Sequence, residues 1–479
     1  MRGDAEYSGM RRPCPTRGRY TANRHCVPGR DPMSGGDRDL LVELYRTALS
    51  AADPARALMV ALDAGGFIAS ERTWIIALGK AAHPLARAGV DWLRQKGEKP
   101  AGGIIIAADP AKSPHSSLTV ATGDHPVPGE KSFAAAESLE TLVRQVQPRD
   151  DVWILLSGGT TSLIASPVRG ISTDDLRAIY QEVLGAGIDI TAMNRIRKRV
   201  SRWGAGRLAV ALAHARVHMF IVSDVIGDEV ASIASGPCSP DPSTAQIVRA
   251  ELDESGLLHR VPRSLIDLLD RTERRMVPET PKAADAAFRA VTTTIIASNR
   301  VALRAAAVAA EARGLPVRLR RKPLKGEAAV IGGRLARRFI ADAMADAEAG
   351  AADAEAYTGP VCYLCGGETT VTLGDRPGQG GRCQELALAA ARILEGAPAE
   401  ITLLAAGTDG RDGPTDAAGA VVDGSTWRRI ATAGRNADTD LAGHNAFPAL
   451  EAAGDLIRTG PTGTNVMDLI LAIVRPKSA

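Results

Sequence analysis

The sequence predicts an α/β protein with two domains and a doubly wound parallel sheet. Its 479 residues are too many for one ordinary core. Short apolar runs, glycine turns and helical periods alternate along the chain, which is typical of strands connected by helices. Aromatic residues make up only 4%, so the core must consist of closely packed small aliphatic side chains, as helices laid on parallel strands require.

The first domain is expected at residues 37–270. Residues 1–36 precede it as a leader that is either disordered or the product of a mis-assigned start, because they are rich in Arg, Gly and Pro and lack an apolar period. Apolar runs then predict buried strands, and apolar spacings of three and four predict helices. The strands are expected at 73–78, 103–107, 152–156 and 217–222, and the helices at 40–62, 79–95, 131–146, 173–184 and 192–214.

A junction separates the two domains. Residues 235–244 are rich in Pro and Ser, and residues 271–290 form a charged connector that contains proline. The carboxyl-terminal domain is expected at residues 291–479, where the alternation resumes. Its strands are expected at 291–297, 316–319, 361–373, 401–404 and 468–474, and its helices from 299, at 327–348 and at 384–394.

Composition excludes several classes of function. The net charge is +3 and arginine is scattered, so no nucleic-acid surface is expected. No segment approaches ~20 uninterrupted apolar residues, so no membrane span is expected. The six cysteines are few for this length, and without a secretory apolar segment they indicate the cytoplasm. Cys362-Tyr-Leu-Cys365 has no second pair to complete a zinc site, which favours buried thiols.

Ala405–Ala420 contains the densest group of candidate functional residues. It follows an apolar strand and holds Asp409, Asp412 and Asp416 between glycines, which let the backbone approach a ligand closely. Carboxylates there could bind Mg²⁺ or accept a proton. The alternative is an ordinary Asp/Gly surface turn. Because ligands bind at the carboxyl ends of strands in α/β sheets, we predict that this loop is functional.

Three other strand ends offer candidate binding groups. Residues 157–162, Ser-Gly-Gly-Thr-Thr-Ser, combine backbone N–H groups and hydroxyls at a helix start, which suits an anion, although a simple helix cap fits as well. Lys80 lies just past a strand, either as a ligand group or as a solvated lysine. Asp224 follows a further strand, where it could bind a metal or sugar hydroxyls or cap the next turn.

Arg382 lies behind three glycines at the start of a predicted helix. Its charge opposes the helix dipole there, and a charged ligand would compensate. His83, His115 and His125 show no metal-ligand spacing, and His125 is interpreted as a loop residue. The sequence has no G-x-x-x-x-G-K-[ST] motif, and residues 204–209 match the loosest dinucleotide pattern but follow a helical period. Together the loops suit phosphoryl transfer in a cleft.

Seven motifs then follow one another along the chain. They are ALGKAA (77–82), GDHPVPGEKS (123–132), LLSGGTTSL (155–163), SDVIGDEVASIASGPCSPDPST (223–244), GGET (366–369), GGRCQELAL (380–388) and AAGTDGRDGPTDAAGA (405–420). In this order they resemble the class II glycerate 2-kinases, which carry a carboxyl-terminal MOFRL domain. The resemblance spans about Leu40 to Val474. Some members of that family bear the older label of hydroxypyruvate reductase.

The resemblance implies phosphorylation of D-glycerate at its 2-hydroxyl by ATP and Mg²⁺ or another divalent cation. The site would lie in a cleft between a larger Rossmann-like domain and a smaller carboxyl-terminal α/β domain, whose MOFRL region covers about 360–475. The resemblance implies catalytic roles for Lys80, Arg382 and Asp409. It assigns substrate or phosphate binding to Ser157, Gly158, Gly159, Thr160, Asp224, Glu368, Gly380, Gly381 and Asp412, and metal binding to Asp409 and Asp412. A homodimer is one assembly that it allows.

Two positions depart from the family pattern. Cys383 stands where asparagine is usual, and the Ser157-Gly-Gly-Thr-Thr loop stands where the family has SGGGS, which bears on the choice of hydroxy acid. Two other functions stay open. A hydroxypyruvate reductase dependent on NAD(P)H would need a glycine fingerprint after a strand. A non-catalytic sugar-acid-binding protein would have little need for Lys80, Arg382 and Asp409 together.

Overall fold

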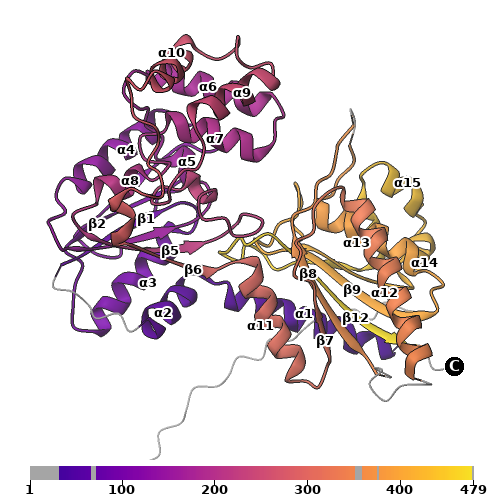
Figure 1. The fold of residues 1–479 in the computed structure, drawn as a ribbon. Coiled ribbons are helices and arrows are strands. Elements are labelled where there is room, and N and C mark those ends of the chain that lie inside the picture. The colour runs from indigo at the N-terminus through magenta and orange to yellow at the C-terminus, as the bar shows by residue number, and fades with distance from the viewer. Residues whose placement is uncertain (1–31, 66–71, 351–358, 375–376, 477–479) are drawn as a thin grey trace, which may run out of the picture.

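A computed structural model describes residues 32–65, 72–350, 359–374 and 377–476. The chain forms two lobes, and each lobe is built on a six-stranded sheet (Figure 1). Residues 1–31 of the expected leader lie outside the described residues, whereas residues 32–36 begin the first helix. Within the described parts, no helix is long and apolar enough to cross a membrane.

The sheet of the amino-terminal lobe is entirely parallel, with the order β3-β2-β1-β4-β5-β6. Its strands are β1 (Thr73–Leu78), β2 (Gly102–Ala107), β3 (Leu118–Thr122), β4 (Asp151–Leu156), β5 (Arg216–Val222) and β6 (Val291–Ala297). Alternate residues of β1 enter different cores, Ile75 on one face and Ile76 on the other. Both faces are therefore covered, which confirms the predicted doubly wound parallel sheet.

Helices cover the two faces of this sheet and also form a separate layer. Those that flank the sheet are α2 (Pro54–Ala64), α3 (Ala82–Gln95), α4 (Glu130–Val143), α5 (Thr160–Leu163) and α8 (Arg207–Ala211), with the short 3₁₀ helices η1 (Ile233–Ser235) and η2 (Ala286–Ala290). The separate layer, at the top of Figure 1, has its own apolar core. It consists of α6 (Thr173–Gly185), α7 (Ile190–Val200), α9 (Ala245–Glu254) and α10 (Arg263–Glu273).

The prediction of a single helix at residues 192–214 is wrong. Helix α7 ends at Val200, and α8 starts only at Arg207. Between them Ala205 and Gly206 have positive φ values of 55° and 79°, which a right-handed helix cannot contain. The apolar period therefore spans two helices joined by a turn.

The sheet of the carboxyl-terminal lobe is mixed, with the order β11-β10-β9-β12-β8-β7. Its strands are β7 (Val317–Leu319), β8 (Val361–Gly367), β9 (Ala399–Gly407), β10 (Gly419–Asp423), β11 (Leu456–Ile457) and β12 (Asp468–Pro476). β7 and β8 are parallel, and every other pair is antiparallel. Its helices are α11 (Asn299–Glu311), α12 (Ala328–Gly350), α13 (Arg382–Leu394), α14 (Thr426–Thr432), α15 (Ala437–Ala442) and α16 (Ala446–Ala453).

The chain exchanges elements between the lobes, which differs from the expected division at residue 291. β6 was expected in the second domain but pairs with β5 in the first sheet. Conversely, α1 (Pro32–Ala51) packs with α11 against the second sheet, as Figure 1 shows. Leu41 and Leu44 are fully buried there, and each such side chain contributes about 1.5–3 kcal/mol to folding. The open face of the second sheet is therefore covered by a helix that precedes the first sheet in sequence.

Candidate active site

A pocket of ≈240 Å³ lies between the two lobes. Its walls come from strand ends of the first sheet and from loops of the second. The lining residues are Lys80, Ala81, Ser157, Gly158, Val222, Asp224, Asp409, Gly463, Thr464 and Asn465. The structure thus brings together five of the predicted site residues, Lys80, Ser157, Gly158, Asp224 and Asp409, although they are distant in the sequence.

Lys80 is presented by a tight turn after β1. Gly79 has a φ of 103°, and a Cβ there would lie only 2.4 Å from the carbonyl oxygen of Ser157. Ser157 Oγ accepts a hydrogen bond from the N–H of Ala81 at 2.9 Å and donates one to the carbonyl of Leu78 at 3.1 Å. The Lys80 side chain is exposed and, among the described residues, makes no ion pair. Its charge is therefore available to a ligand.

Some polar groups of the glycine loop after β4 bond within the protein, and others are available to a ligand. Thr160 is fully buried and donates to the carbonyl of Ser157 at 2.8 Å, so the hydroxyls of both residues are used inside the protein. In the described part of the chain, the backbone N–H groups of Gly158 and Gly159 make no hydrogen bond. These two donors, rather than the hydroxyls, are the groups that can bind an anion.

Asp224 lies against this loop at the end of β5. A Cβ on Gly158 would lie 1.8 Å from Asp224 Oδ2, so only glycine fits between the carboxylate and the loop. Burial raises the pKa of Asp224, while the nearby Lys80 acts in the opposite direction. The carboxylate and the ammonium thus line the same pocket from β5 and β1, the two strands that flank β4.

Asp409 enters the pocket from the other lobe, two residues after β9. Its side chain is exposed, and Oδ1 accepts a hydrogen bond from the N–H of Arg411 at 3.1 Å. Among the described residues, no group donates to Oδ2. One oxygen therefore fixes the carboxylate to its loop and the other is available to a ligand.

Arg382 does not line the pocket but lies next to it, held by two carboxylates. Its Nε and Nη2 donate to Asp468 Oδ2 and Oδ1 at 2.7 and 2.9 Å, and Nη1 lies 3.0 Å from Glu368 Oε1. Burial disfavours its charge, but these two carboxylates outweigh that effect and raise the pKa of Arg382. The guanidinium is therefore charged and fixed in orientation.

Glu368 connects this cluster with the first lobe. Burial raises its pKa, and Arg382 opposes the shift. Lys80 and Asp224 also act on its charge, although they belong to the other sheet. The predicted residues Glu368 and Arg382 therefore face the same cleft as the pocket.

Asp412 caps helix α13 instead of lining the pocket. The side chain is 3% exposed, and its two oxygens accept hydrogen bonds from the N–H groups of Cys383 and Gln384 at 3.1 and 2.8 Å. A Cβ on Gly381 would lie 2.3 Å from Asp412 Cγ, and Gly380 packs against the same loop at Gly413. The predicted binding residues Asp412, Gly380 and Gly381 thus hold the start of the helix that carries Arg382.

The two residues expected to bind the metal do not lie together. Asp409 is exposed in the pocket, whereas Asp412 is buried under α13. Across the residues that the structure describes, no group of three His, Cys, Asp or Glu side chains could hold a metal ion. Asp224 and Asp409, which line the pocket from opposite lobes, are its two carboxylates.

Sequence reasoning missed the segment Gly463–Asn465 and the carboxylate of Asp468. The segment lines the pocket, and Thr464 donates to the carbonyl of Ala52 at 2.7 Å, which ties it to the end of α1. The only signal was a Gly-Thr-Asn turn just before a buried strand. That turn precedes its strand, whereas the rule for ligand sites in α/β sheets points to the carboxyl ends of strands.

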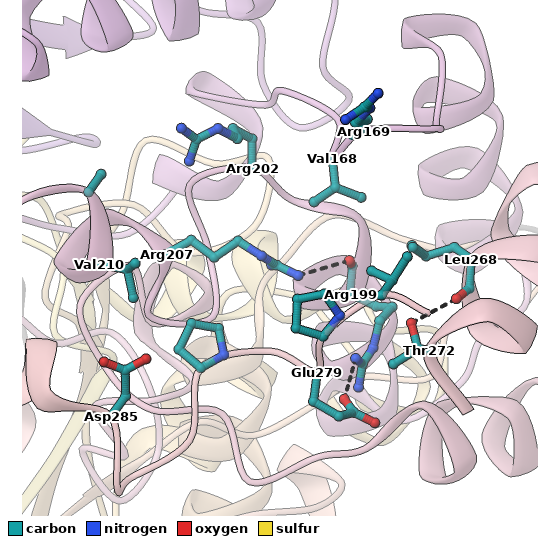
Figure 2. Close-up of a pocket in the computed structure, with 14 residues that line it drawn as sticks. Val168, Arg169, Arg199, Arg202, Arg207, Val210, Leu268, Thr272, Glu279 and Asp285 are labelled. Atoms are coloured by element: carbon teal, nitrogen blue, oxygen red, sulfur yellow. Dashed lines mark hydrogen bonds and ion pairs between the residues drawn. The ribbon is translucent and has the colours of Figure 1, made fainter. Parts of the chain in front are cut away.

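A larger pocket of ≈500 Å³ lies elsewhere in the amino-terminal lobe (Figure 2). It contains none of the predicted residues, and its central arginines have structural partners. Arg207 donates to the carbonyls of Lys198 and Ser201, both at 2.8 Å, at the end of α7. Arg199 is paired with Glu279 at 2.5 Å. Size alone therefore does not make this pocket the active site.

Judged on the described residues, the cleft pocket combines a lysine without an ion pair, the unbonded backbone N–H of Gly158 and an available carboxylate on two α/β lobes. This arrangement is the one expected of a phosphoryl-transfer enzyme. Residues 40–270 match a domain of unknown function, DUF4147, and residues 361–468 match the MOFRL family.

Three relatives identify the family. A glycerate 2-kinase of Pyrococcus horikoshii is 34% identical over 92% of this chain and 98% of its own length. A putative hydroxypyruvate reductase of Agrobacterium vitis is 35% identical over 92% of this chain and 96% of its own. The crystal structure of a glycerate kinase from Thermotoga maritima has a TM-score of 0.80 and 32% identity over 92% of this chain and all of that one. The chain belongs to the glycerate 2-kinase family.

Proposed function

We propose that the protein transfers the γ-phosphoryl group of ATP to the 2-hydroxyl of D-glycerate, giving 2-phospho-D-glycerate. One observation carries the proposal: a single pocket unites Lys80 and the Gly158 loop of one sheet with Asp409 of the other. The relatives named for glycerate kinase activity support it over nearly the whole chain.

The roles of the residues follow from their partners. Phosphoryl transfer through a loose transition state depends mainly on positioning and on neutralising charge. Lys80 and the N–H groups of Gly158 and Gly159 have no partner within the described part of the chain, so they are donors for phosphoryl oxygens. Asp409 Oδ2 accepts a hydrogen bond from the 2-hydroxyl and takes its proton as the hydroxyl oxygen bonds to the γ-phosphorus. The bond from that phosphorus to the bridging oxygen of ADP breaks in the same step, and ADP leaves.

Arg382 supplies a second, fixed positive charge beside the pocket. Asp468 and Glu368 hold its guanidinium, so its position does not change when a ligand enters. We assign to Arg382 the stabilisation of an anionic oxygen of the substrate or of the transferred group. Asp412 supports this role indirectly, because it caps the helix on which Arg382 lies.

The residues present fit a divalent cation that arrives with the nucleotide. Mg²⁺ is usually bound through one or two carboxylates together with substrate phosphates, so a cluster of three protein carboxylates is not required. Asp224 and Asp409 are the side chains that would hold it. When bound, the ion would neutralise charge on the phosphates.

The reductase function has less support. The Gly204–Ala209 segment, which matches the dinucleotide pattern loosely, follows helix α7 and not a strand, so it lacks the strand-turn-helix context of that fingerprint. We further propose that the enzyme works in the cytoplasm, and the four cysteines that the structure describes, all free and buried, are compatible with a reducing compartment. A homodimer is the assembly to be tested, by light scattering.

Phosphorus NMR of the product tests the proposal. The protein is incubated with D-glycerate and MgATP, and separately with hydroxypyruvate and NADH. We expect the resonance of a 2-phosphate in the first mixture and no NADH oxidation in the second. A 3-phosphate would contradict the proposed regiochemistry, and NADH oxidation without phosphate transfer would contradict the class.

A further inference from the structure

The loop between β3 and α4 brings a histidine, which none of the site assignments uses, beside the glycine loop after β4. His125 is exposed, and a Cβ placed on Gly159 would lie 3.2 Å from its Cδ2 and 3.3 Å from its Nε2. The same Cβ would lie 3.5 Å from Cγ of Lys80. The edge of the imidazole and the stem of Lys80 therefore lie over the same residue, Gly159, of the glycine loop after β4.

The groups that meet at this point are donors without partners in the part of the chain that the structure describes. Among the described residues, neither ring nitrogen of His125 makes a hydrogen bond. The ammonium of Lys80 has no ion pair there, and the N–H groups of Gly158 and Gly159 are unbonded. Unpartnered donors that converge on one small volume indicate a site for an anion.

The charges around His125 support the same reading. Partial burial, Lys80 and Arg197 all lower the pKa of His125, and no carboxylate of the described residues opposes them. Arg197 reaches this region from α7, where it lies over the ring of Tyr180 at 4.9 Å. The imidazole is therefore neutral near pH 7, with one N–H donor, in a positive environment.

We propose that His125 is a further substrate-binding residue, whose Nε2–H donates to an oxygen of an anionic group, while Lys80 and the Gly158 and Gly159 N–H groups bind oxygens of the same group. This inference rests on the proposed kinase function. The oxygen belongs either to the carboxylate of glycerate or to a phosphate of the nucleotide, and both are anions of the same hydrogen-bonding chemistry.

Histidine NMR provides a test that does not depend on turnover. The protein is labelled with ¹³C-histidine, and the His125 signal is assigned as the one missing in His125→Gln. We expect D-glycerate alone, or a non-hydrolysable MgATP analogue alone, to shift the ring resonance of His125 and to leave that of His83 in place. His83 is the matched control, because its Nε2 is already bonded to the carbonyl of Asp109. An unmoved His125 signal with both ligands would overturn the proposal.

Steady-state kinetics identify the source of the anion. His125→Ala removes the donor, so we expect a KM at least about tenfold higher for the ligand that it binds, the usual cost of a lost hydrogen bond to a charged group. His125→Gln places an amide N–H near the position of Nε2 and should restore most of that affinity. A raised KM for glycerate identifies its carboxylate, and a raised KM for ATP identifies the phosphates.

The kinetic result also separates this inference from the function on which it rests. If His125→Ala has unchanged KM values for both substrates in an active kinase, the role of His125 is refuted and the function stands. If the unmodified protein transfers no phosphoryl group, the function fails, whereas a shifted His125 resonance would still establish the anion contact. His83→Ala, carried through the same assays, should match the unmodified protein.

Discussion

The two sheets deliver residues to the cleft in different ways. All strands of the first sheet run parallel, so the carboxyl ends of β1, β4 and β5 meet at one edge and present Lys80, the Gly158 loop and Asp224. In the second sheet β12 runs antiparallel to β8 and β9, and Asp468 at its start pairs with Gly367 and Gly407 at their ends. The mixed sheet can therefore place a carboxylate from the beginning of a strand beside residues from the ends of others.

This difference in topology produces a difference in electrostatics. The cation of the parallel lobe, Lys80, has no ion pair among the described residues, whereas the cation of the mixed lobe, Arg382, is held by Asp468 and Glu368. A lysine on a flexible stem can follow a moving phosphoryl group, while a clamped guanidinium marks a fixed position. We infer that the parallel lobe supplies a mobile positive charge, Lys80, and that the mixed lobe supplies a positive charge of fixed position, Arg382.

Lys80→Met should produce the largest effect, because methionine keeps the stem and removes the unpaired charge. We expect folding to be retained and turnover to fall by roughly 10³–10⁵-fold, the range for a cation that neutralises charge on a transferred phosphoryl group. Circular dichroism and a coupled ADP-release assay check the two expectations. A variant with near-normal turnover would show that Lys80 is a solvated surface residue, and the comparison between the two cations would fail.

Asp409→Asn tests the available carboxylate of the other lobe. Asparagine is nearly the same shape and still accepts the hydrogen bond from Arg411, so the loop should keep its structure. Turnover should fall by roughly 10²–10⁴-fold, the usual contribution of a positioned acid–base group. Raising the Mg²⁺ concentration should restore the rate only if Asp409 is chiefly a metal ligand. Full activity at ordinary Mg²⁺ would remove Asp409 from the site.

Asp468→Asn tests whether the fixed position of Arg382 matters. It weakens the two hydrogen bonds that orient Arg382 without changing a residue of the pocket. We expect turnover to fall by about 10²-fold, as for a small displacement of a catalytic group. KM values should change much less, since the pocket itself stays intact. Glu368→Gln, which removes the charge of the other carboxylate that holds Arg382, should lower turnover in the same direction. If turnover of Asp468→Asn falls only in proportion to the fraction of protein that is unfolded, a positioning role for Asp468 would be contradicted.

The sequence sufficed for the pocket residues that follow strand ends, because they obey a simple rule. Lys80, Asp224 and Asp409 all come directly after apolar runs, and the rule that ligands bind beyond the carboxyl ends of strands locates each of them. Local pattern also indicates glycines where the backbone approaches closely, and Gly158 against Asp224 is such a case. The fold class and the position of these three residues at one pocket could therefore be predicted from short segments alone, while their roles stay predictions.

Other features depend on partners that are distant in the sequence. The direction of β12 is decided by its pairing with β8 and β9, so no local pattern could identify Asp468 at its start as the partner of Arg382. The apolar stripe of α1 predicts a buried face but not which sheet it covers. Likewise, the hydroxyl of Thr160 and the carboxylate of Asp412 resemble ligand groups until their backbone partners are known.

Asp412, which caps the helix that carries Arg382, provides the test of the mixed lobe with the smallest expected effect. Burial raises its pKa to about 7, although the N–H groups of Gln384 and Cys383 act against the shift. Because the folded state then binds the proton more tightly than the unfolded state, this contribution to stability is complete below about pH 4. It is lost as the pH rises through 7, by up to about 1.4 kcal/mol for each pH unit.

Asp412→Asn cannot titrate, so its stability should lack this dependence. Relative to the variant, the unmodified protein should lose free energy of unfolding steadily between pH 5 and 7, as measured by urea denaturation. Asp416→Asn in the same loop is the matched control, because Asp416 is exposed and paired with Arg458. If the difference between the protein and Asp412→Asn stays constant with pH, the buried carboxylate titrates normally. The mixed lobe would then hold Arg382 on a helix whose cap stays charged throughout the physiological range.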